Sequence, residues 1–145
     1  MDIKLEKYLI AYGWKYRRIG DHQIVTGWAG NSRDYHLHIE TMDTLVCFSI
    51  EKFFSFDEDY ENFPEILVLL LEMNKESPLL KLSLDSRGDV ILLAEVMQNQ
   101  LSEDNFFNLI SVMGHYADQF HFRLSHLAEK YQSVSYTHLT LPTKA

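Results

Sequence analysis

The segment from Leu80 to Met97 has the sequence pattern of a β-hairpin, and this feature constrains the fold more than any other. Three leucines from Leu80 to Leu84 alternate with polar residues, which is the two-residue period of a strand with one buried face. The residues Asp85-Ser86-Arg87-Gly88 have turn composition, and an apolar segment from Val90 to Met97 follows. The fold must therefore contain an antiparallel sheet.

Three helices are predicted around this hairpin. Near the start, apolar residues recur at helical spacing until Gly13, a typical terminating residue. A central helix has Pro64 in its first turn, extends to about Glu76 and is ended by Pro78. A long last helix is capped by Ser102. Its apolar stripe, spaced by three and four residues, is Phe106, Leu109, Ile110, Met113, Ala117, Phe120, Leu124, Leu127 and Tyr131.

Between Trp14 and Phe54 the sequence favours three or four antiparallel strands. Turn-forming residues at Gly20-Asp21 and from Asn31 to Asp34 separate segments rich in aromatic and β-branched residues. The predicted fold class is α+β, an antiparallel sheet packed with N-terminal, central and long C-terminal helices in the order α-β-β-β-α-β-β-α. Because no linker and no internal repeat divides the chain, we expect one domain over residues 1–133.

The last residues differ in character from the rest. The sequence SYTHLTLPTKA follows a charged helical segment abruptly, and it resembles a translated sequencing adapter. We therefore interpret residues 134–145 as a non-native tail and leave them out of the fold prediction.

Composition limits the classes of binding partner and the cellular compartment that are expected for this protein. The net charge of −8 opposes binding to nucleic acid and to anionic membranes. The longest apolar run is far shorter than the roughly 20 residues of a membrane-spanning helix, and no signal peptide is recognisable. Cys47, the only cysteine, lies in an apolar strand segment and is expected to be buried and unreactive. These features indicate a cytoplasmic protein.

The search for catalytic and metal-binding chemistry gives two candidate pairs. His36 and His38 would point from the same strand face, and His115 with Asp118 lie three residues apart on the last helix. Neither pair has a third ligand or a nucleophile motif beside it. The acidic cluster from Asp57 to Glu61 lacks the ligand spacing and glycine of a calcium loop. We therefore expect no enzyme activity, no metal and no cofactor.

The aromatic residues at the start of the strand region have two readings. Trp14, Tyr16 and Trp28 could stack on nucleic-acid bases, but they lack surrounding basic residues. We predict that they pack on the sheet.

The central helix has an unusual pattern. Every residue from Ile66 to Leu71 is apolar, so no polar stripe appears before Glu72. A helix that is apolar on all sides requires burial on more than one side. A sheet would cover one side, and a partner or a second copy of the chain would cover the rest. The predicted interface residues are Ile66, Leu67, Leu70 and Leu71, with an ordinary core helix as the alternative.

The second half of the chain resembles the YbjN family. The pattern is a helix ending in Leu-x-x-x-Asn, a strand, an Asp-x-x-Gly turn, a second strand and a capped helix. In this sequence its landmarks are Leu70, Asn74, Leu82, Asp85, Gly88, Val90, Leu93, Leu101, Ser102, Phe106 and Asp118. The motif covers residues 68–120, and the order of elements extends it to residues 1–131. The resemblance implies a fold like that of type III secretion chaperones, frequent dimerisation and a chaperone-like or regulatory function, with no catalytic residues to carry over.

The predicted function is therefore that of a non-enzymatic protein-binding module acting through apolar surface of the sheet and helices. A protein client and a homodimer are the expected partners. Two alternatives remain open. One is a small metal- or ligand-binding domain or enzyme that uses the strand or helix histidines, and the other is a structural subunit of a larger assembly.

Overall fold

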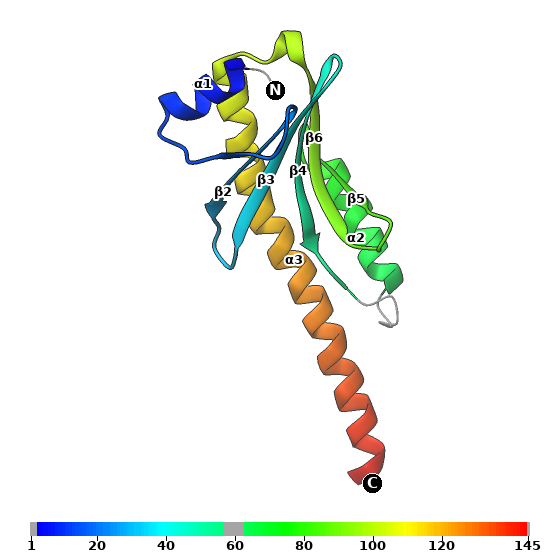
Figure 1. The fold of residues 1–145 in the computed structure, drawn as a ribbon. Coiled ribbons are helices and arrows are strands. Elements are labelled where there is room, and N and C mark those ends of the chain that lie inside the picture. The colour runs from blue at the N-terminus through cyan, green and yellow to red at the C-terminus, as the bar shows by residue number, and fades with distance from the viewer. Residues whose placement is uncertain (1–2, 57–62, 145) are drawn as a thin grey trace.

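The computed structural model describes residues 3–56 and 63–144 of the chain. It contains one six-stranded antiparallel sheet and three α-helices (Figure 1). The elements are, in chain order, α1 (Ile3–Ala11), β1 (Arg17–Arg18), β2 (Gln23–Ala29), β3 (Asp34–Met42), β4 (Leu45–Phe54), α2 (Phe63–Glu76), β5 (Lys81–Leu84), β6 (Val90–Met97), the 3-10 helix η1 (Gln98–Gln100) and α3 (Glu103–Lys144).

The α+β class and the antiparallel sheet are confirmed. The predicted order of elements lacked the short helix η1 and β1, a two-residue strand that pairs with β2 through Arg17 and Arg18. Two residues are too few to show a hydrophobic period, so the sequence carried no signal for this strand. The strand order in the sheet is β1-β2-β3-β4-β6-β5, which leaves β5 and β1 at the edges.

All buried side chains of the strands lie on one face of the sheet. The register places Ile24 opposite Ile39, Ile39 opposite Phe48, and Phe48 opposite Ala94, and all four are buried. The helices cover this face with their own apolar residues. The main contributions are Leu5 and Leu9 of α1, Ile66, Leu70 and Met73 of α2, and Phe106, Leu109, Ile110, Met113, Ala117, Phe120 and Leu124 of α3. The described parts of the chain thus form two layers, with the helices on one face of the sheet and no described helix on the other, here called the uncovered face.

An irregularity near the end of β4 adds one more residue to the core. The register with β6 shifts between Ile50 and Phe54, and Lys52 has a positive φ of 48°. Strict alternation would place Phe53 on the face opposite to Ile50, yet both are fully buried. The shift therefore turns the Phe53 ring back toward the core, where it stacks on Tyr35 at 6.1 Å between ring centroids.

The predicted caps and turns are present. Gly13 has a φ of 72°, and the next residue donates its backbone N–H to the carbonyl of Leu9 at the end of α1. The hydroxyl of Ser102 accepts a hydrogen bond from the backbone N–H of Asn105 at the start of α3. In the hairpin turn, the Asp85 carboxylate accepts hydrogen bonds from two backbone N–H groups, and Gly88 has a φ of 85°. The predicted acidic cluster, residues 57–61, lies outside the described residues.

The backbone of α3 continues as a helix through Lys144, and its last part extends beyond the sheet (Figure 1). Residues 134–144 are therefore helical in the structure rather than a separate segment. The domain limit at residue 133 remains a prediction.

Candidate protein-binding surface

The four residues predicted to form an interface on α2 divide into two groups. Ile66 and Leu70 are buried against the sheet and belong to the core. Leu67 is partly buried, and the side chain of Leu71 is 70% exposed. The apolar run on this helix thus faces both the core and solvent. Only Leu67 and Leu71 are placed where a second molecule would contact them without unfolding the helix.

An apolar groove of about 610 Å³ lies between α2 and α3. Two exposed side chains mark it, Val68 of α2 at 54% and Phe122 of α3 at 69% exposure. Leu69 and Leu127 line it as well and are only partly exposed. The remaining lining residues are Pro64, Glu65, Glu72, Arg123 and His126. A groove of this volume has room for several apolar side chains of a ligand or a partner.

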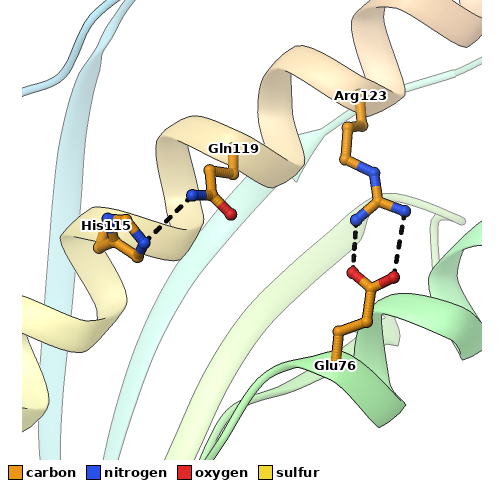
Figure 2. A network of polar contacts seen from close by, with 4 residues as sticks. All are labelled: Glu76, His115, Gln119 and Arg123. Carbon is orange, nitrogen blue, oxygen red and sulfur yellow. Dashed lines mark hydrogen bonds and ion pairs between the residues drawn. The ribbon is translucent and has the colours of Figure 1, made fainter.

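An ion pair links α2 and α3 next to the groove. The guanidinium of Arg123 on α3 donates two hydrogen bonds to the carboxylate of Glu76 at the end of α2, at 2.5 and 3.5 Å (Figure 2). This contact joins the two helices directly and neutralises the charge of Arg123. On the α2 side, Glu65 and Glu72 form no ion pair with any other described residue. That rim of the groove is therefore acidic.

The position of α3 is fixed by the turn between β2 and β3. Asp118 Oδ1 accepts a hydrogen bond from the backbone N–H of Asn31 at 3.0 Å and another from the Tyr35 hydroxyl at 3.3 Å. Burial, followed by the nearby Asp118 carboxylate, raises the pKa of Tyr35 to about 12, so its hydroxyl remains a donor. A Cβ at Gly30 would clash with the Tyr35 ring and lie 2.7 Å from Asp118 Oδ1. The β2–β3 turn thus packs tightly against α3.

His121 makes the second contact of α3 with this turn. Its Nδ1 lies 3.4 Å from the hydroxyl of Ser32, and its ring makes edge contacts with Phe53 and Phe54. Burial is the main reason that the pKa of His121 is lowered, and Arg33 acts in the same direction. No local sequence pattern singles out His121, because its contacts come from residues that are far away in the chain.

The predicted pair of His115 and Asp118 is not formed. The ring of His115 is exposed and lies 3.1 Å from the side-chain nitrogen of Gln119 (Figure 2), whereas Asp118 bonds to the β2–β3 turn. Although three residues apart on one helix, the two side chains lie on its solvent-facing and sheet-facing sides. The structure therefore does not bring together the two side chains that base catalysis by this pair would require.

The strand histidines lie on the uncovered face of the sheet. His36 is exposed and His38 partly exposed, and both alternate with buried residues as predicted. Within the described parts of the chain, no group of three His, Cys, Asp or Glu side chains is arranged to hold a metal ion.

Cys47 lies on the same uncovered face and is half-buried. The expectation that it would be a buried core residue was therefore wrong. Burial, and to a lesser degree the carboxylates of Glu95 and Glu40, raise the pKa of its thiol. Low reactivity is therefore still expected, mainly because of partial burial and secondarily because of these two carboxylates.

The aromatic residues at the start of the strand region pack as predicted. Trp14 and Trp28 are partly buried against the core, with ring centroids 6.3 Å apart, and Trp28 also contacts Tyr35.

Among the helices that the structure describes, none combines the length and apolarity needed to cross a membrane.

The two exposed apolar residues of the groove were not among the predicted interface residues. Phe122 lies outside the predicted apolar stripe of α3, and Val68 lies within the apolar run of α2 but was not selected. An aromatic residue on the polar side of a helix was the available signal for Phe122.

A comparison with family models assigns the fold to a known family. Residues 4–125 match the model of the YbjN family, described as "Putative bacterial sensory transduction regulator". The chain belongs to the YbjN family. The resemblance noted in the sequence is thereby confirmed over most of the chain. A comparison with curated proteins gave no match.

Solved structures share the fold at low sequence identity. YbjN from Escherichia coli, described as "a putative transcription regulator", is 12% identical with a TM-score of 0.62, covering 87% of this chain and 90% of that one. A chain of the heterodimeric ExoU–SpcU complex from the type III secretion system of Pseudomonas aeruginosa is 18% identical with a TM-score of 0.59, covering 80% and 93%.

The type III secretion chaperone SycH of Yersinia pestis, solved with a fragment of YscM2, is 14% identical with a TM-score of 0.52, covering 81% of this chain and 97% of that one. Together, these similarities establish that the fold of this chain is the fold found in type III secretion chaperones.

Proposed function

We propose that this protein is a non-enzymatic protein-binding module with a chaperone-like or regulatory function. The observation that carries the proposal is the apolar groove between α2 and α3, which leaves Val68 and Phe122 exposed on a folded monomer. Exposed apolar side chains that gather in a groove mark sites of protein interaction. The family description as a regulator and the neighbours solved in complexes with partner proteins support the same function.

The charge and the cysteine chemistry support a cytoplasmic location and a protein partner. The net charge of −8 disfavours nucleic acid and anionic membranes as partners. The single cysteine forms no internal disulfide, as expected for a protein kept in a reducing compartment.

A selection from a random peptide library displayed on phage tests the proposal without assuming a partner. The wild-type chain is expected to enrich peptides that bind at one site per chain. The variant Val68→Glu should lose them because a charge in an apolar contact is costly. Leu84→Glu, at an exposed leucine of β5 outside the groove, is the matched control. Enrichment by neither protein, or equal enrichment by wild type and Val68→Glu, would refute groove-mediated binding.

Self-association through α2 is a second proposal, and the exposure of Leu71 supports it. Leu67 and Leu71 are one helical turn apart and do not line the groove, so a dimer contact here would leave the groove free. We expect light scattering of the full chain to give a dimer, which Leu71→Asp converts to a folded monomer. A monomeric wild type would exclude this interface. The buried Ile66 and Leu70 are unsuitable for this test because charging them would unfold the chain.

A further inference from the structure

We infer that the groove between α2 and α3 accepts a basic amphipathic helix from a partner protein. The inference rests on the proposed function and specifies the conformation and charge of the ligand. It follows from three features of the groove: its two helical walls, the apolar side chains that line them and the sign of the charges along one rim.

The length and the apolar lining of the two walls match those of a short helix. Along α2 the lining residues extend from Pro64 to Glu72, which is about two helical turns and roughly 12 Å. Val68 and Leu69 from this wall, with Phe122 and Leu127 from α3, offer apolar contacts on both sides. A helix placed in such a groove buries residues at positions i, i+3 or i+4, and i+7, which together also span two turns.

The rim on α2 selects the charge of the ligand. Glu65 and Glu72 are exposed and lie seven positions apart in the sequence, which places them about 10.5 Å apart along one side of the helix. Lysine or arginine side chains seven residues apart on a ligand helix match this spacing. On the opposite rim, Arg123 is neutralised by Glu76, and His126 stacks on Phe122 at 6.0 Å between ring centroids. The net charge of −8 further favours the approach of a basic segment.

A second copy of this chain fits the groove less well. Docking α2 of another copy would bring Glu65 and Glu72 of that copy to the acidic rim, and like charges at close range oppose binding. The occupant that fits the groove is therefore a basic helix from a different protein.

Synthetic peptides of about 18 residues test this inference directly. The probe carries leucine at i, i+3, i+4 and i+7 and lysine along the flanks of that stripe. A second peptide has glutamate in place of each lysine, and a third has the composition of the probe in an order that destroys the stripe. Fluorescence anisotropy with the full chain measures binding at low and high salt.

The lysine peptide is expected to bind at least ten-fold more tightly than the other two, and to weaken as salt is added. Glu65→Gln combined with Glu72→Gln should weaken it by about five-fold, because exposed ion pairs contribute modestly. The control is Glu40→Gln combined with Glu51→Gln, which removes the same charge from the uncovered face of the sheet. Binding to the control should equal wild type.

Equal affinity for the lysine and glutamate peptides, or equal loss in both double variants, would overturn the inference. So would binding of the scrambled peptide as tightly as the probe. If library peptides depend on Val68 but carry neither a helical stripe nor basic residues, the proposed function stands while the basic helix is refuted. If the library also yields no peptide that depends on Val68 and none of the three synthetic peptides binds, both are refuted.

Discussion

The side-chain amide of Asn74 on α2 forms two hydrogen bonds with the backbone of Leu82 on β5. Its nitrogen donates to the carbonyl of Leu82 at 3.2 Å, and its oxygen accepts from the N–H of the same residue at 2.5 Å. The amide thus pairs with a backbone N–H and C=O as a neighbouring strand would. This contact explains why the YbjN-like pattern places an asparagine at the end of the central helix, just before an edge strand.

Replacing Asn74 with alanine is expected to destabilise the protein by about 2 kcal/mol, because two partly buried backbone groups of β5 lose their partner. Urea denaturation followed by circular dichroism measures this change. Lys75→Ala, at the next and exposed position, is the control and should change stability by less than about 0.5 kcal/mol. A variant as stable as the control would show that the amide only occupies space between α2 and β5.

The bond between Asp118 and Tyr35 should appear as an energetic coupling between α3 and β3. Tyr35→Phe keeps the buried ring and is expected to cost about 1 kcal/mol, while Asp118→Ala should cost about 2 kcal/mol because Asn31 also loses its acceptor. In a double-mutant cycle, the double variant should be more stable than the sum of the single effects predicts, by about 0.5 to 1 kcal/mol. Strict additivity would mean that the hydrogen bond contributes nothing.

Local features were predictable from the sequence, and contacts between distant segments were not. The turn from Asp85 to Gly88 and the Ser102 cap depend on residues within four positions of each other, so the sequence specifies them directly. The α2–α3 groove depends on Val68 and Phe122, which are far apart in the chain. No local pattern indicates that these two helices lie side by side.

The central helix shows the same limit in a single element. Its apolar run correctly indicated that more than one side of the helix is apolar. The rotation of the helix about its axis, however, is set by packing on the sheet, which buries Ile66 and Leu70 and exposes Val68 and Leu71. Sequence periodicity could not distinguish these pairs because every position from 66 to 71 is apolar.

His121 should make stability depend on pH in the weakly acidic range. Its pKa in the folded protein lies below the ordinary value of 6.5, so the unfolded chain binds a proton more readily. Its contribution to stability is therefore complete above about pH 6.5 and is lost as the pH falls toward the lower folded pKa. The groups facing it are Ser32 and Arg33 of the turn, Phe53 and Phe54 of β4, and Asp118 of α3.

Urea denaturation of wild type and His121→Gln at several values between pH 7.5 and 5 tests this dependence. Stability of the variant should fall less than that of wild type over this range. His36→Gln, at an exposed position on the other face of the sheet, is the control and should keep the wild-type slope. Parallel curves for wild type and His121→Gln would show that the titration of His121 is not linked to folding.

Cys47 should react slowly with thiol reagents although it is not a core residue. Burial and the carboxylates of Glu95 and Glu40 raise the pKa of the thiol, so less of the reactive thiolate is present at neutral pH. Reaction of the native chain with Ellman's reagent is expected to be slower than that of free glutathione.

The urea-unfolded chain should react faster than the native chain because both causes of the raised thiol pKa are removed. Glu40→Gln should give a smaller acceleration, since burial is the larger cause and remains. A native rate equal to the unfolded rate would mean that the uncovered sheet face gives the thiol no protection.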